Sequence, residues 1–225
     1  MTELRLPAKR LRGLHDRLLA RYGPQHWWPG DSAFEIMVGA VLTQNTAWTH
    51  VERAIDNLRR AGALDPARIL QLPSERLAEL LRPSGYFNIK ARRLKHFCAW
   101  YLDAGGWDAL RERDTQALRA ALLAVHGVGP ETADDMLLYA FERPVFVIDA
   151  YTRRLFARQG LISGDEGYEV LRRACEQALG EDVALYNEFH ALIVAHAKAH
   201  CRPRPDCAAC PVGSGCSYAD RVLAG

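Results

Sequence analysis

Lysine, long apolar runs and strand-forming segments are all scarce in this 225-residue sequence. No stretch approaches the ~18 consecutive apolar residues of a membrane span, and the first ten residues lack the apolar core of a signal peptide. We therefore expect a cytoplasmic protein that makes no membrane contact. Apolar residues make up 49% of the chain and charged residues 25%, which excludes disordered, collagen-like and coiled-coil proteins.

The 29 basic residues comprise only four lysines against 25 arginines, and 27 acidic residues reduce the formal net charge to +2. So small a net charge favours an acidic partner only weakly. Any binding of nucleic acid must therefore be inferred from particular residues.

The apolar residues recur mainly with the period of a helix, in stripes separated by turns that contain glycine or proline. One β-like run, residues 144–148, stands alone, and a lone short strand cannot build a sheet. The sequence therefore predicts an all-α fold of roughly ten or eleven helices. Residues 201–216 contain three prolines and two glycines, so this segment is not expected to be helical.

The same segment carries four cysteines in the spacing C-x5-C-x2-C-x5-C, at positions Cys201, Cys207, Cys210 and Cys216. Disulfides are disfavoured in a cytoplasmic protein. Structural zinc usually takes two close cysteine pairs, whereas only one C-x2-C is present here. Four thiolates on longer arms suit a 4Fe-4S cluster, which we predict ahead of zinc.

A second motif, H-G-V-G-P-E-T-A-D at residues 126–134, lies between two predicted helices. Gly127 and Gly129 allow a sharp turn around Val128, and the proline that follows suits the first position of a helix. Backbone N–H groups at such a turn bind anions, so this hairpin, with Thr132, could hold a DNA phosphate. A plain helix–helix turn would explain the same residues.

Asp149 directly follows the apolar run 144–148 and precedes a predicted helix. Aspartate is a favoured N-cap, and capping alone would account for it. Capping also keeps a carboxylate ionised near a helix N-terminus, where it can stabilise an oxocarbenium-like sugar and orient a water molecule.

Aromatic and amide side chains form a further group, with Trp27 and Trp28 in a turn and Trp48 just after Gln44 and Asn45. A single tryptophan most often packs in the core. Two adjacent tryptophans rarely face the same core, so one is expected to stack on a planar ligand, while amides hydrogen-bond base edges well.

In this order, the L-T-Q-N-T segment, the hairpin, V-I-D and the four cysteines resemble the helix-hairpin-helix, glycine/proline-rich, aspartate superfamily of DNA glycosylases, and within it the endonuclease III branch. The resemblance implies two helical lobes with DNA bound between them. The first is a six-helix lobe over residues 26–139 that carries the hairpin. The second joins residues 1–25 to 140–225 and carries the catalytic aspartate and the cluster loop, 201–216.

By this resemblance Asp149 is the catalytic aspartate, the hairpin grips a phosphate, and Gln44 fills the gap left by a flipped base. Bifunctional members carry a lysine at the position of Glu131, and its amine forms a Schiff base with the sugar before strand cleavage. A carboxylate cannot do this, so we expect base removal without strand cleavage. Lys90 and Lys95 are expected to contact phosphate. The first cysteine spacing, five residues in place of six, also departs from endonuclease III.

A subgroup of 3-methyladenine DNA glycosylases shares further motifs with this chain. They are W-W-P at 27–29, the L-T-Q-N-T segment, R-P-S-G-Y-F-N-I-K-A-R-R-L at 82–94, and G-P-E-T-A-D at 129–134. This implies a damaged base held between Trp27 or Trp28 and Trp48, with Lys198 near the pocket. We therefore predict an enzyme that flips an alkylated purine out of double-stranded DNA, working as a monomer at the nucleoid of a bacterium or archaeon.

Two other interpretations stay open. One is an endonuclease III-like glycosylase and AP lyase for oxidised pyrimidines. The other is a non-enzymatic helix-hairpin-helix protein that binds DNA and carries an iron–sulfur cluster.

Overall fold

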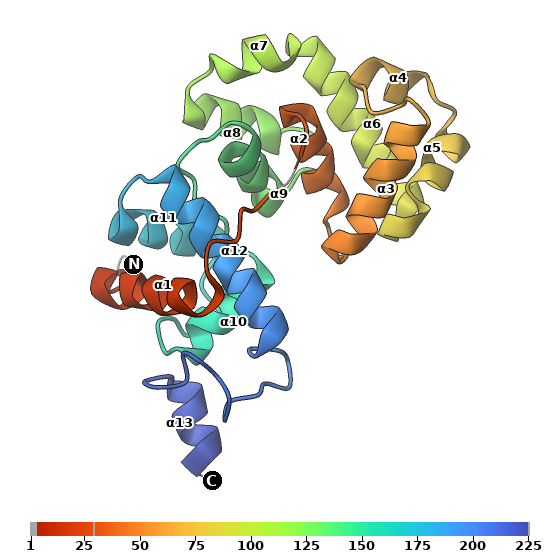
Figure 1. Cartoon of the computed structure of the whole chain (residues 1–225). Helices are drawn as coiled ribbons and strands as arrows, with labels where there is room; N and C mark the ends of the chain where they lie inside the picture. The colour runs from red at the N-terminus through yellow and green to blue at the C-terminus, as the bar shows by residue number, and fades with distance from the viewer. Residues whose placement is uncertain (1–3, 29, 225) are drawn as a thin grey trace. The chain divides into compact units, whose positions relative to one another are not determined.

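The computed structural model describes residues 4–28 and 30–224, and every regular element within those ranges is a helix (Figure 1). The chain divides into two compact units, Met1–Trp27 with Pro144–Gly225, and Trp28–Arg143. The predicted all-α fold with two helical lobes is confirmed. Among the described helices, none combines the length and apolar character that crossing a membrane requires.

The unit Trp28–Arg143 holds the longer series of helices. In chain order they are α2 (Ala33–Leu42), α3 (Trp48–Arg60), α4 (Pro66–Gln71), α5 (Ser74–Leu80), the 3₁₀ turn η1 (Arg82–Ser84), α6 (Phe87–Asp103), α7 (Gly106–Arg111), α8 (Thr115–Leu123), α9 (Pro130–Asp135) and the π-helical turn η2 (Met136–Ala140).

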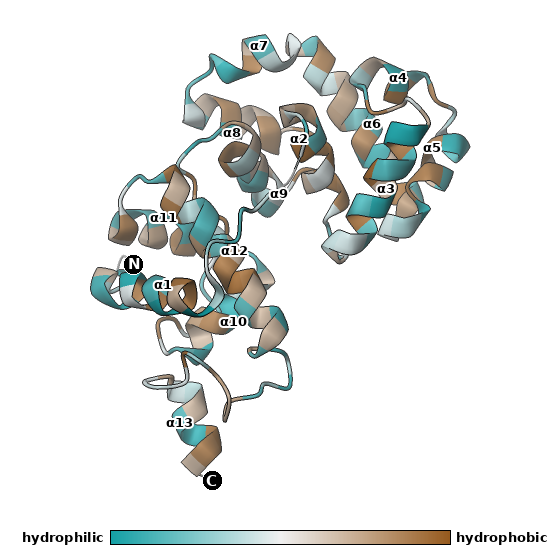
Figure 2. Cartoon of the chain, in the orientation of Figure 1, coloured by the Kyte–Doolittle hydropathy of each residue, from teal (hydrophilic) through white to brown (hydrophobic). Residues whose placement is uncertain are grey.

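Helix α2 forms the centre of this unit because almost no polar residue interrupts it. Ser32 caps its start by accepting a hydrogen bond from the Glu35 backbone N–H at 3.2 Å, and the residues from Met37 to Leu42 are buried. It packs against α3, α6, α9 and η2. Helix α3, by contrast, buries one apolar face and presents a hydrophilic face, as the colouring of Figure 2 shows.

Two lysines in this unit contact backbone carbonyls, and the burial of Lys90 corrects the expectation that it contacts phosphate, while for the half-buried Lys95 that expectation stays a prediction. The ammonium group of Lys90 is buried and donates to the carbonyls of Leu42 and Ser84 at 2.8 and 2.6 Å. Lys95 donates to the carbonyl of Leu72 at 2.5 Å. Burial lowers the pKa of Lys90 to about 8, with the charge of Arg93 as a smaller cause. Both lysines close turns between helices, and Lys90 lies too deep to reach DNA.

The second unit joins the two ends of the chain. Its helices are α1 (Ala8–Tyr22), α10 (Ala150–Arg158), α11 (Tyr168–Leu179), α12 (Val183–Ala199) and α13 (Ser217–Ala224). Helix α12 is the central element, since α1 and α10 both pack against it. Its buried positions run from Tyr186 to Ala197 and form the core of this unit.

The β-like run 144–148 is extended but pairs with no strand in the described chain, as predicted. Val145, Phe146, Val147 and Ile148 are each at most 3% exposed. The Phe146 backbone N–H donates to Glu176 of α11 at 3.0 Å, so a side chain replaces the missing ladder partner. This buried segment delivers Asp149 to the start of α10.

Candidate active site and nucleic-acid interface

Asp149 is the N-cap of α10 and is nearly enclosed, at 9% exposure. Its Oδ1 accepts a hydrogen bond from the Thr152 backbone N–H at 2.7 Å, and its Oδ2 lies 3.5 Å from Nε2 of His190 on α12. Burial alone would raise the pKa of this carboxyl. The hydrogen bond and charge of His190, together with the Thr152 N–H, outweigh burial and hold the pKa below its ordinary value of 3.8. Asp149 is therefore a buried carboxylate that stays ionised at neutral pH.

His190 was not found from the sequence. It lies on the apolar stripe of α12 and is 4% exposed, so its pattern is that of an ordinary core residue. Only the packing of α10 against α12 brings it to Asp149. A lone histidine on an apolar helix face carries no further signal in one sequence.

The hairpin between α8 and α9 contains two glycines with different structural demands. Gly127 has φ +94°, and a Cβ there would overlap the side chain of Arg93. Gly129 has φ −95°, is exposed, and a Cβ there would meet nothing within 4 Å. Val128, between them, is 7% exposed and anchors the turn. Gly127 is thus required by the fold, whereas Gly129 leaves open space at the surface of the turn.

Gln44 ties the L-T-Q-N-T segment to this hairpin. Its amide donates to the Gly127 carbonyl at 2.9 Å and to the Thr132 hydroxyl at 3.0 Å, and its oxygen accepts from Arg93. Thr132 is itself 5% exposed. The gap-filling role of Gln44 stays a prediction, and it would require these bonds to break. Asn45, the next residue, is exposed with φ +55°.

The structure brings together two of the three predicted aromatic residues. Trp28 meets Trp48 edge to face, with ring centroids 4.8 Å apart and planes at 70°. The ring of Tyr139 in η2, a residue that the sequence places on an apolar stripe, lies 4.7 Å from that of Trp28, with the planes at 33°. Gly39 of α2 makes this cluster possible, because a Cβ there would lie 3.3 Å from both indoles. A planar ligand could enter between Trp28 and Trp48 only if their rings part and turn parallel.

Trp27 belongs to the other unit, where its ring lies 5.6 Å from the ammonium group of Lys198. Lys198 is exposed near the end of α12. The motif W-W-P therefore divides between the two units, and its proline, Pro29, lies outside the described residues. Glu131 is exposed in the first turn of α9, where a carboxylate is favoured by the helix dipole.

The four cysteines of the tail gather around α10 and α12. Arg158 donates to the Cys201 sulfur at 3.3 Å and accepts from the Cys216 thiol at 3.2 Å, while Nε2 of His196 lies 3.7 Å from the Cys210 sulfur. Successive turn bonds fold the backbone, from Cys210 N–H to the Cys207 carbonyl and from Cys216 N–H to the Gly213 carbonyl. Cys201 and Cys216 are buried, and Cys207 and Cys210 are half-buried.

These thiols do not converge on one point. In the part of the chain that the structure describes, no three His, Cys, Asp or Glu side chains are placed to hold a single metal ion. They do lie near one another: burial first, and then the charges of the other cysteines, raise the pKa of Cys207 and Cys210. Four cysteine thiols close together in one loop are the donor set that a 4Fe-4S cluster takes.

Cys98 and Cys175 are buried in helices away from this group.

Comparison with known proteins identifies the family. Residues 38–181 match the model of the HhH-GPD superfamily of base excision DNA repair proteins. A Methanocaldococcus jannaschii protein named as a DNA repair glycosylase, MJ1434, is 45% identical over 202 residues, covering 88% of this chain and 92% of the relative. Endonuclease III of Escherichia coli K12 is 26% identical over 192 residues, covering 85% of this chain and 86% of that enzyme.

Solved structures agree. The crystal structure of the H. pylori 3-methyladenine DNA glycosylase MagIII bound to 1,N6-ethenoadenine is similar with a TM-score of 0.73 and 32% identity, covering 85% of this chain and 95% of that one. A non-covalent endonuclease III–DNA complex shares the fold with a TM-score of 0.85 at 21% identity, covering 98% of this chain and all of that one. The chain belongs to the HhH-GPD superfamily, whose members are DNA glycosylases of base excision repair.

Proposed function

We propose that this glycosylase removes alkylated purines from double-stranded DNA by hydrolysis, without cutting the strand. The observation that carries the proposal is the buried, ionised Asp149 on α10, in a chain that has Glu131 where a bifunctional member has its lysine. The likeness to the H. pylori 3-methyladenine glycosylase, at 32% identity, supports the alkylated-purine assignment over oxidised pyrimidines.

Asp149 would act on the sugar. As the bond between C1′ and the base nitrogen breaks, positive charge develops on the sugar, and a carboxylate already ionised in a low-dielectric site stabilises it without reorganising. When this bond breaks, its two electrons leave with the base. A water molecule then attacks C1′ and gives up a proton to solvent. An alkylated purine already carries a positive charge and leaves as a neutral base, so this reaction needs little acid catalysis.

The aromatic cluster would select the base. Stacking on a flipped base contributes about 1–3 kcal/mol per base, which offsets much of the few kcal/mol that flipping costs. Trp28 and Trp48 are the proposed pair because their rings already touch. By the family resemblance, Trp27 and Lys198, which lie 5.6 Å apart, would also act on the base. Asn45 and Gln44 would contact the duplex, and the hairpin residues 127–129 with Thr132 would hold a phosphate.

We further propose that Cys201, Cys207, Cys210 and Cys216 hold a 4Fe-4S cluster. When bound, such a cluster would supply a rigid cross-link of the C-terminal loop, and hydrolysis of a glycosidic bond needs no electron transfer from it. Arg158 and His196 contact the cysteine sulfurs directly and would stabilise the thiolates.

Base release from a panel of duplexes tests the substrate and reaction together. The panel contains 3-methyladenine, 7-methylguanine, 1,N6-ethenoadenine and thymine glycol, and each is scored before and after alkali. We expect release from the alkylated purines, with strand breaks only after alkali. Borohydride trapping of a covalent adduct on the thymine-glycol duplex would instead indicate the lyase.

Asp149→Asn tests the role of the carboxylate separately from its cap. Asparagine caps helices about as well as aspartate, so the variant should fold, with a melting temperature lowered only by loss of the stability that the charge contributes. Loss of the charge should slow base release by about 10²-fold or more, by analogy with other preorganised electrostatic groups. Release is measured under single-turnover conditions with spontaneous depurination subtracted. An unchanged rate of base release would show that Asp149 only caps the helix.

A further inference from the structure

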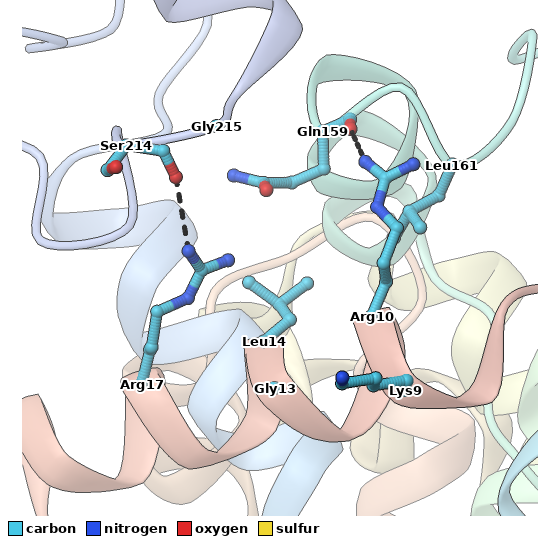
Figure 3. Close-up of a pocket in the computed structure, with 9 residues that line it drawn as sticks. All are labelled: Lys9, Arg10, Gly13, Leu14, Arg17, Gln159, Leu161, Ser214 and Gly215. Carbon is cyan, nitrogen blue, oxygen red and sulfur yellow. Dashed lines mark hydrogen bonds between the residues drawn. The ribbon is translucent and has the colours of Figure 1, made fainter.

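A hollow of about 570 Å³ lies between the N-terminal half of α1 and the loop that follows the third cysteine (Figure 3). Helix α1 supplies the lining from Lys9 to Arg17. The end of α10, at Gln159, and the loop at Ser214 and Gly215 face it. None of these residues belongs to the proposed base pocket, the hairpin or the cysteine set.

The rim of this hollow is cationic. Lys9, Arg10 and Arg17 are all exposed, and the lining contains no carboxylate. Arg10 donates to the Gln159 carbonyl at 2.6 Å and Arg17 to the Ser214 carbonyl at 3.1 Å, as the dashed lines in Figure 3 mark. A guanidinium has five N–H donors, so these bonds fix both arginines and leave donors for an anion.

The floor of the hollow is apolar, formed by Leu14, which is 1% exposed, and Leu161. Gly13, next to Leu14 in α1, also lines the hollow. Glycine within a helix lowers helix stability relative to alanine. The backbone does not require it, since Gly13 has no positive φ, and a Cβ there would meet nothing within 4 Å. Because glycine has no side chain, Gly13 leaves space in the hollow beside the apolar residues Leu14 and Leu161.

We infer that this hollow, the α1 hollow, binds a short acidic peptide segment of a partner protein through two or more carboxylates and one apolar side chain. The carboxylates would pair with Lys9, Arg10 and Arg17, and the apolar side chain would enter over Gly13 and Leu14. Charge complementarity selects an anion. The apolar floor selects a peptide over DNA, because a duplex presents phosphates at its surface without an apolar side chain to fill the space.

Fluorescence anisotropy with a labelled peptide, Asp-Asp-Asp-Leu-Phe, tests this on the full-length protein. Gly13→Leu fills the hollow and Lys9→Glu reverses a rim charge, and each should weaken binding about tenfold or more. Gly167→Leu, where a Cβ also meets nothing within 4 Å, and Arg60→Glu on α3 are the matched controls. They should change affinity less than twofold.

Three outcomes would overturn the inference. They are absence of saturable binding, wild-type affinity in both Gly13→Leu and Lys9→Glu, or tighter binding of a single-stranded oligonucleotide of equal charge in competition. The last would assign the surface to nucleic acid. Base release should be unchanged in Gly13→Leu, so failure here is distinguishable from failure of the proposed glycosylase function. If Gly13→Leu fails to fold, Lys9→Glu alone decides.

Discussion

Asp149 combines two properties that usually oppose each other, burial and ionisation. Its environment replaces water with the Thr152 N–H at 2.7 Å and His190 at 3.5 Å. Because the folded pKa lies below the ordinary 3.8, the carboxylate contributes stability at pH values above 3.8, and this contribution is lost as the pH falls through the folded value. The charged form that the proposed reaction requires therefore persists throughout the neutral and mildly acidic range.

His190→Ala should narrow the pH range over which Asp149 is ionised. Without the His190 side chain, which lies 3.5 Å from its Oδ2, Asp149 keeps the burial that raises its pKa, and the acid limb of base release should move up by about 1–3 pH units. Single-turnover rates between pH 4 and 8 measure the shift. His190→Gln retains a hydrogen-bond donor and should move the limb less. Identical profiles for wild type and both variants would exclude His190 as a positioning residue for Asp149.

A buried ion pair links α8 and α9, the two helices on either side of the hairpin turn. Arg119 of α8 donates from Nε to Oδ1 of Asp134 at 2.7 Å and from Nη2 to Oδ2 at 3.1 Å, and Asp134 is fully buried. This bidentate pair therefore joins the two helices that flank the hairpin.

Removing one partner of this ion pair should lower the free energy of unfolding far more than replacing both partners with apolar residues. Arg119→Met removes the bidentate cationic partner of a buried carboxylate and should lower the free energy of unfolding by about 3–5 kcal/mol, while the double variant with Asp134→Leu should recover most of the loss. Urea denaturation measures both. Additive losses in the double variant would contradict the assignment of the pair as one unit.

The two hairpin glycines have different expected roles: Gly127 is required by the fold, and Gly129 is proposed to contact a phosphate. Gly129→Ala should fold normally, because its φ of −95° suits alanine and its Cβ meets nothing within 4 Å, yet it should weaken DNA binding if a phosphate approaches there. We expect about a fivefold or greater loss, consistent with removal of one backbone contact. Gly127→Ala, at φ +94°, should instead lower the melting temperature. Fluorescence anisotropy with a labelled duplex at fixed salt measures the DNA affinity. Wild-type affinity in Gly129→Ala would show that no phosphate binds at Gly129.

At the scale of the molecule, two units with separate cores should respond separately to loss of the cluster. Cys210→Ala should lower the iron content, and hydrogen exchange should speed up at least about tenfold in α10 and α12, which border the cysteines, because ligand binding and local folding are coupled. Helices α3 and α6, in the other unit, should keep their protection.

Cys175→Ala is the matched control for this experiment, since Cys175 is a buried core residue of the same unit. It should leave the iron content unchanged. Equal acceleration of exchange in both units, or a colourless protein carrying one zinc ion after anaerobic purification, would contradict the proposed cluster.

The sequence by itself determined the helical class, the turn positions and the motif order, because helical period, capping residues and glycine breaks act over a few neighbouring residues. It also placed Asp149 at a helix start and the four cysteines in an irregular tail. Only the tertiary structure decided what depends on contacts between distant segments. It buried Lys90 among carbonyls, brought His190 to Asp149, joined Gln44 to the hairpin, and assigned Trp27 and Trp28 to different units. A side chain's partner across 40 residues or more is fixed by helix packing, and one sequence carries no local record of it.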